Sequence, residues 1–187
     1  MNSDDFLAVV FQAAEYLQPL IELNTAAYTD KVDLNGAPYH DHPLRVASII
    51  AQQGPKFVGA GIPFDRVTDA IAVGLTHDLI EDFGGKYVLV LKDHLTPDAF
   101  EALQAISRRD GESYKNYLSR VGESPIATIV KMADLMDNLR PDRLPHPMTK
   151  KAADRVDRYT KAYAYLVKAL RVTQGKLSGL GGSSSIH

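Results

Sequence analysis

Apolar residues recur along most of this chain with the spacing of one face of an α-helix, and no other feature of the sequence constrains the fold as strongly. Near the amino terminus this stripe comprises Phe6, Val9, Val10, Ala13, Ala14, Leu17 and Ile21. Steps of three and four residues place such side chains on one side of a helix, and Ser3 or Asp4 can cap its start. The stripe predicts a helix over residues 4–27.

The rest of the chain shows the same periodicity, interrupted by turn-forming residues such as Asn35-Gly36 and Gly84-Gly85. Further helices are predicted over residues 42–53, 64–82, 97–108, 113–122, 125–139 and 149–172. The run at 86–95 is rich in β-formers, but it lies between two predicted helices with no partner strand, so we predict a short helix there. The sequence therefore predicts an all-α fold, a single-domain helical bundle.

The composition of the chain limits the classes of function that it can have. A length of 187 residues fits one domain, which we place at residues 1–174, followed by a flexible Gly/Ser-rich tail at 175–187. The absence of cysteine excludes disulfides, thiolate metal ligands and thiol nucleophiles. The net charge of −2 predicts no nucleic-acid partner and no binding to anionic membranes. No apolar run reaches the roughly 20 residues of a membrane span, and the acidic start, unlike a secretory signal, favours the cytoplasm.

One predicted helix carries polar residues where its apolar face should continue. In the helix at 64–82, the stripe formed by residues 67–75 runs on to Asp78, with His77 beside it. Glu81 and Asp82 follow one helical turn later, so that His77 stacks on Glu81 and Asp78 on Asp82. Carboxylates on a core-facing stripe are costly unless positive groups or a metal ion meet them.

The helix at 125–139 repeats this feature. Its apolar stripe continues into Asp134 and Asp137, and Asn138 lies one turn beyond Asp134. Taken alone, Asp137 fits a solvated charge at the rim of a helix bundle. Asp134 is different because it can converge with acidic and imidazole groups from other helices.

Four residues from three predicted helices form a candidate metal site: His42, His77, Asp78 and Asp134. Two imidazoles and two carboxylates suit a manganese, iron, cobalt or zinc ion and leave positions open for water and substrate. Glu81 lies one turn from these ligands, within reach of an attacking water, and we predict that it is the general base. Asp82 can orient a ligand or a water.

Three segments resemble the HD-domain hydrolases of the RelA/SpoT class. They are GAPYHDHPLRVA at 36–47, LTHDLIED at 75–82 and KMADLMDNLR at 131–140. The resemblance continues through ISRRDGESYKNYLSRV, as in short stand-alone members, and covers roughly residues 28–170. It implies an all-helical, manganese-dependent enzyme, with another divalent transition metal as an option. The reaction it implies is removal of the 3′-pyrophosphate of a guanosine alarmone such as (p)ppGpp.

The resemblance also implies residue roles. The metal ligands would be the four residues named above, and Glu81 and Asp82 would be the catalytic acidic pair. Asn138 would lie near the substrate ribose, and Arg140 matches a basic position of the family. Members that bind alarmone 5′-phosphates offer two basic residues before the Gly-x-Pro-Tyr turn, whereas this chain has only Lys31 there.

Further cations are candidates for phosphate contacts. They are Arg45, Arg108, Arg109 and Lys131. We predict that Lys31, Arg45, Asn138 and Arg140 bind the substrate, which we expect to be a small nucleotide. Asp137 stands where long bifunctional members commonly carry histidine, which changes the local charge.

Two other functions remain open at the level of sequence. The first is a phosphatase acting on another nucleotide, such as the 2′-phosphate of NADPH, and an adenosine alarmone also fits as substrate. The second is a non-catalytic nucleotide-binding module that retains the motifs as structure. The presence of both Glu81 and Asp82 favours an enzyme, because a degenerate member should lose its catalytic residues before its metal ligands.

Overall fold

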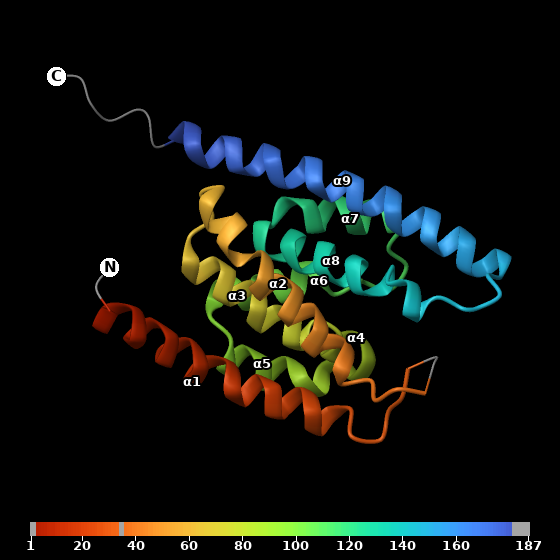
Figure 1. Cartoon of the computed structure of the whole chain (residues 1–187), viewed down its shortest axis with the longest axis horizontal. Coiled ribbons are helices and arrows are strands. Elements are labelled where there is room, and N and C mark those ends of the chain that lie inside the picture. Colours follow the sequence, from red (N-terminus) through yellow and green to blue (C-terminus); the bar gives the residue numbers. More distant parts are fainter. Residues whose placement is uncertain (1–2, 34–35, 181–187) are drawn as a thin grey trace.

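Helices make up nearly all of the described chain, which in this computed structural model comprises residues 3–33 and 36–180. The elements in order are α1 (Ser3–Ala27), α2 (Asp41–Gly59), α3 (Phe64–Thr76), α4 (Leu79–Phe83), η1 (Gly84–Tyr87), α5 (Val88–His94), α6 (Pro97–Ile106), α7 (Tyr114–Glu123), α8 (Pro125–Asn138), η2 (Pro141–Arg143) and α9 (Lys150–Leu180). The predicted all-α bundle is confirmed (Figure 1). None of the helices in the described ranges is both long and apolar enough to cross a membrane.

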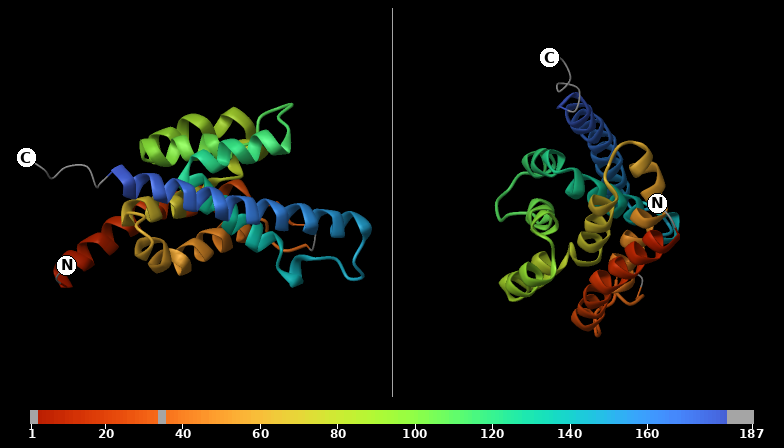
Figure 2. Two further views of the ribbon diagram at one scale, coloured as in Figure 1. Left: turned by 90° about the horizontal axis from the view of Figure 1, so that it is seen from above. Right: turned by 90° about the vertical axis from the view of Figure 1, so that its left-hand side faces the viewer.

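Helix α3 is the centre of the bundle. It packs against α2, α8, α1 and α6. Helices α1 and α5 lie on one side of this central group, and α9 lies on the opposite side, across α8 and α7 (Figures 1 and 2). The central helices therefore have both sides covered, which explains why their stripes are rich in fully buried residues.

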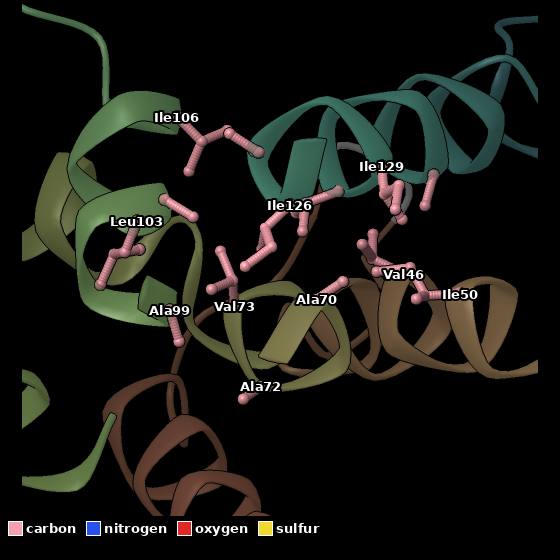
Figure 3. Close-up of a cluster of buried hydrophobic side chains, with 14 of the residues drawn as sticks. Val46, Ile50, Ala70, Ala72, Val73, Ala99, Leu103, Ile106, Ile126 and Ile129 are labelled. Carbon is pink, nitrogen blue, oxygen red and sulfur yellow. The ribbon is translucent and has the colours of Figure 1, made fainter. Parts of the chain in front are cut away.

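The part of the core shown in Figure 3 brings together side chains from α2, α3, α6 and α8. Val46 and Ile50 of α2 face Ile129 of α8, and Val73 of α3 lies beside Ile126 (Figure 3). Gly74 allows α2 and α3 to approach closely, because a Cβ atom at this position would lie 2.9 Å from Cδ1 of Ile50. This close approach fixes the distance between the start of α2 and the end of α3.

Four helices begin with the side-chain cap expected where backbone amides have no partner within the helix. Thr96, Ser113, Ser124 and Thr149 accept hydrogen bonds from the backbone amides three residues later, at the starts of α6, α7, α8 and α9. The β-rich run at 86–95 is helical, as predicted, since it forms the end of η1 and then α5.

The predicted helix over 64–82 is interrupted, which corrects its boundaries. Helix α3 ends at Thr76 and α4 begins at Leu79, so His77 and Asp78 lie at the junction. The carbonyl of Gly74 accepts a hydrogen bond from Nδ1 of His77 at 2.9 Å. In a continuous helix that carbonyl would accept a hydrogen bond from the backbone amide of Asp78. The imidazole therefore competes with this amide for the Gly74 carbonyl.

Two further boundaries differ from the prediction. Helix α2 continues past residue 53 to Gly59, through Pro55. Gly54 packs against Val67 of α3, where a Cβ would lie 3.3 Å from Cγ1 of Val67, and this packing outweighs the local helix-breaking tendency. Helix α9 extends past residue 172 to Leu180. Asn35 of the predicted turn, residues 181–187 of the predicted tail and the side chains of Phe6, Val9 and Val10 lie outside what the structure describes.

Candidate active site

The junction of α2, α3 and α8 gathers two histidines and an aspartate. His42 lies in the first turn of α2, His77 follows the end of α3, and Asp134 lies on α8. Nε2 of His42 is 3.2 Å, and Nε2 of His77 3.8 Å, from Oδ1 of Asp134. All three residues are buried, and their ligand atoms lie within 4.8 Å of one another, so they form a group that could hold a metal ion.

Hydrogen bonds on the far side of each ring set the direction of its free nitrogen. Nδ1 of His77 donates to the carbonyl of Gly74, and Nδ1 of His42 donates to Oδ2 of Asp137 at 2.7 Å. When the imidazoles are neutral, each Nε2 therefore presents a lone pair toward the cluster. The Nε2 atom of His77 is buried and has no hydrogen-bond partner. This donor set, with both rings oriented by outer hydrogen bonds, fits a divalent transition metal.

Asp78 joins this cluster at its outer edge. Its carboxylate lies 3.2 Å from Nε2 of His77 and 3.7 Å from Nε2 of His42. The side chain is 20% exposed, and Tyr39 donates its hydroxyl to Oδ2 at 2.8 Å. All four predicted ligand residues are thus brought together, with one oxygen of Asp78 engaged by tyrosine.

Lys131 supplies part of the positive charge that the buried carboxylates require. Its Nζ lies 2.7 Å from Oδ2 of Asp134, and Asn138 donates to Oδ1 at 2.6 Å. Burial acts to raise the pKa of Asp134, but Lys131 and the two histidines outweigh it and hold the pKa well below its usual range. Lys131, predicted as a phosphate contact, is therefore also the counter-ion of a candidate metal ligand.

Asp137 corrects the expectation of a solvated rim charge, because it is completely buried. It accepts hydrogen bonds from His42, from Nε of Arg45 at 2.8 Å and from Arg143. Burial opposes its ionisation, yet these three donors together lower its pKa. The partners lie 95, 92 and 6 residues away in the chain, so local sequence patterning carries no signal for this contact.

The charge state of His42 follows from this environment. Burial acts to lower its pKa, but hydrogen bonds to Asp134 and Asp137 and the charge of Asp78 raise it to about 9. Without a metal ion the imidazole is therefore protonated near neutral pH, and a bound cation would replace that proton.

Two tyrosines hold the acidic residues of the junction. Tyr28 donates its hydroxyl to Oδ2 of Asp82 at 2.9 Å, as Tyr39 does to Asp78. The two rings are in contact, with centroids 4.7 Å apart. Burial raises the pKa of both hydroxyls, and the nearby carboxylates raise it further, so both remain donors. Asp82 is thus held by a tyrosine, and its role in orienting a ligand or a water stays a prediction.

Glu81 lies on α4 at the surface beside this cluster. Its Oε1 accepts a hydrogen bond from the backbone amide of Arg108 at 2.6 Å. The pKa of Glu81 is raised, first by desolvation and then by Asp78, against the opposing effects of the Arg108 amide, Lys131 and His77. A carboxyl group with a raised pKa beside a candidate metal site is suited to accept a proton.

A cavity of about 420 Å³ opens onto the cluster. Its lining includes Val32, Asp33, Tyr39, His42, Asp78, Lys131, Asp134, Asn138, Arg143, Arg155 and Tyr159. The last three are functional candidates that sequence reasoning missed. Arg155 and Tyr159 are four residues apart on α9, where their spacing resembles that of any amphipathic helix and marks no function.

Of the four predicted substrate contacts, Asn138 is the one found among the residues described as lining this cavity. Arg45 is engaged with Asp137, and Arg140 pairs with Asp142 at 2.7 Å. Lys31 places its Nζ 4.1 Å from the centre of the Phe83 ring. The roles of Lys31, Arg45 and Arg140 in binding substrate stay predictions.

Fold and site together define an all-helical domain with a candidate His/His/Asp metal centre beside a cavity lined by both acidic and basic residues. The chain has the fold of a solved protein described as a metazoan ortholog of SpoT that hydrolyzes ppGpp and plays a role in starvation responses. The two share a TM-score of 0.60 and 19% identity, over 88% of this chain and 96% of the other. No protein-family model matches the chain.

Curated proteins that are similar to this chain in sequence also carry names from (p)ppGpp metabolism. The bifunctional (p)ppGpp synthase/hydrolase RelA of Mycobacterium tuberculosis is 26% identical over 151 residues, which cover 75% of this chain. The GTP pyrophosphokinase of Streptomyces coelicolor is 32% identical over 108 residues, or 57% of the chain. The chain spans only 19% and 12% of the length of these two proteins. The resemblance to the RelA/SpoT class predicted from three motifs is confirmed.

Proposed function

We propose that this chain is a metal-dependent nucleotide phosphohydrolase that removes the 3′-pyrophosphate of a guanosine or adenosine alarmone such as (p)ppGpp. The observation that carries the proposal is the buried, unpartnered Nε2 of His77, which lies beside Asp78 and Asp134 on the wall of a cavity that also carries cations. Similarity to a protein described as hydrolysing ppGpp supports the same substrate class.

We assign manganese, or another divalent transition metal, to His42, His77, Asp78 and Asp134. When bound, such an ion activates a water molecule and neutralises charge on the phosphate under attack. The outer hydrogen bonds from His77 to Gly74 and from His42 to Asp137 keep the imidazoles in the orientation that metal binding requires.

Glu81 takes the proton of the attacking water in this proposal. The water oxygen bonds to the phosphorus attached to the 3′ oxygen, and the bond between that phosphorus and the 3′ oxygen breaks. The 3′ oxygen takes up a proton from solvent, and pyrophosphate leaves as one unit. Asp82, held by Tyr28, contributes negative charge beside Asp78 and orients the water.

The cavity walls provide the cations that a diphosphate needs. Lys131 and Arg143 already face carboxylates, whereas Arg155 makes no ion pair within the described residues. An arginine without a carboxylate partner in a cavity is suited to bind phosphate oxygens. Tyr159 and Asn138 line the same cavity and provide an aromatic face and an amide for the nucleoside.

Product analysis tests this function. Protein loaded with manganese is incubated separately with ppGpp, its adenosine counterpart and NADPH, and pyrophosphate and orthophosphate are assayed separately with no pyrophosphatase present. We expect pyrophosphate from a 3′-pyrophosphorylated nucleotide, and no release after chelation. Orthophosphate from NADPH alone would instead identify a 2′-phosphatase. Absence of any product from metal-loaded protein that binds the nucleotide would identify a binding module.

A further inference from the structure

The loop between α6 and α7 makes a contact that the proposed base depends on. The backbone amide of Arg108, in this loop, donates to Oε1 of Glu81 at 2.6 Å. Among the described protein groups none donates to the second oxygen, Oε2. One carboxylate oxygen is therefore fixed by the backbone, and the other is left to accept a proton. The orientation of Glu81 is only as well defined as the position of this loop.

Arg120 of α7 binds the start of that loop with its whole guanidinium group. Its nitrogens donate to the carbonyl groups of Gln104 at 2.9 Å, Ala105 at 2.7 Å and Ser107 at 3.1 Å. These are carbonyl groups at the carboxyl end of α6, which have no partner within the helix. A lysine has no planar array of donors that could replace these contacts.

Glu112 closes the loop from its other end. Both of its carboxylate oxygens accept from Arg120, at 3.0 and 2.6 Å. Oε2 also accepts from the backbone amide of Arg109 at 3.1 Å, and the Glu112 carbonyl accepts from the Arg108 side chain at 2.9 Å. The bidentate pair thus ties the backbone on both sides of Arg108 to one rigid group.

We propose that Arg120 and Glu112 are positioning residues for Glu81, acting through the Arg108 amide; this rests on the proposed function of Glu81 as general base. Neither residue is among those lining the site cavity, and neither contacts His42, His77 or Asp134. Their effect on turnover therefore passes through the backbone of the loop. Misplacement of a reacting group by about 1 Å can cost up to about 100-fold in rate.

The first test measures hydrogen exchange at the Arg108 amide in the full-length, metal-loaded protein. We expect the amide to be protected in the parent and to exchange much faster in Arg120→Met and in Glu112→Gln. The second variant keeps the shape of the side chain and stays informative if Arg120→Met does not fold. Unchanged protection of this amide in a folded variant would overturn the proposal. This measurement does not depend on activity, so it remains decisive if the proposed function fails.

The second test compares kcat with KM. We expect Glu112→Gln and Arg120→Met to lower kcat by about 10- to 100-fold, with KM and metal content near those of the parent. Adding either change to Glu81→Gln should lower kcat little further, because the residue being positioned has already lost its basicity. An equal loss of kcat in both backgrounds would show a general structural role and overturn the proposal.

Arg66→Met is the matched control. Arg66 also pairs with an acidic residue of α6, Asp98, but it makes no contact with the loop at 107–112 among the interactions described. We expect the Arg108 amide to stay protected and kcat to stay at the parent value in this variant. A loss equal to that in Arg120→Met would mean that disturbing any ion pair near α6 has the same effect. That result would overturn the specific role of Arg120.

Discussion

Two of the cavities with charged walls in this molecule differ in how those charges are matched. The cavity at the candidate site, of about 420 Å³, is lined by Asp78 and Asp134. Their carboxylates face imidazole nitrogens, including the unpartnered Nε2 of His77 behind them. The second cavity, of about 740 Å³, lies between α3, α6, α7 and α8. There Arg66 is paired with Asp98, and Arg120 with Glu112.

This contrast shows that volume is a poor guide to the reactive site. Paired charges on a cavity wall stabilise the fold and leave little to attract a ligand, whereas unmatched donors and acceptors have to be satisfied by something that binds. Beside the smaller of these two cavities, next to the lining residues Asp78 and Asp134, the protein alone leaves the buried Nε2 of His77 without a hydrogen-bond partner. Substitutions at the histidine cluster should therefore lower metal binding and turnover, whereas a substitution confined to the second cavity should not.

The largest effect is expected from His77→Ala. The change removes the unpartnered imidazole, and we expect no bound manganese and no turnover. Parent protein supplemented with manganese and then desalted should retain about one equivalent per chain by elemental analysis. His94→Ala is the matched control, because His94 bonds to a carbonyl of its own helix in the same way but is exposed. Stoichiometric metal in His77→Ala would contradict the site.

A smaller effect is expected from Glu81→Gln, which keeps the volume of the side chain but removes its basicity. We expect metal content and melting temperature to be unchanged, and kcat to fall by about 10²- to 10⁴-fold. Glu101→Gln, on the wall of the second cavity, is the control and should keep full activity. If the activity of Glu81→Gln stays within a few-fold of the parent, Glu81 is not the general base. That role would then belong to Asp82 or to the metal site alone.

Asp137→Asn tests the buried contact that orients His42. Asparagine still accepts a hydrogen bond, but the change removes the carboxylate that pairs with Arg45 and one of the two that face Arg143, and it weakens the hold on the imidazole. We expect manganese affinity to fall by about 10- to 100-fold, with activity recovering at high manganese concentration. Manganese titration of activity measures this, with Asp142→Asn as a surface control. Parent-like affinity in Asp137→Asn would contradict an orienting role.

The helices and the candidate ligands could be predicted from sequence because both depend on local spacing. His77 and Asp78 continue an apolar stripe, and Asp134 does the same on another helix, so convergence of stripes predicted convergence of ligands. The break at His77 was not predictable, because it arises from competition between an imidazole and a backbone amide for one carbonyl. Such competition depends on a rotamer that the apolar pattern does not specify.

Contacts between distant segments were also beyond sequence reasoning. Asp137 resembles a rim charge until α2 and the segment after α8 bring Arg45 and Arg143 to it. Arg155 enters the site because the path of α9 across α8 turns one of its faces toward the cavity. In both cases the sequence specifies the residue type, whereas tertiary packing specifies its partner.

The smallest effect is expected from Arg66→Met, which disturbs the second cavity alone. Arg66 and Asp98 are 42% and 47% exposed, and ion pairs this exposed contribute about 0–1 kcal/mol to stability because water and salt screen them. Methionine retains much of the apolar stem that covers the cavity wall. We therefore expect a fall of at most about 1 kcal/mol in the free energy of unfolding, measured by urea denaturation, with kcat/KM and manganese affinity at parent values. The comparison of the two cavities requires this result. Arg66, unlike Arg120, has no described contact with the loop that holds Glu81, so a folded Arg66→Met variant that loses catalysis would show that the functional region extends beyond the histidine cluster to the larger cavity.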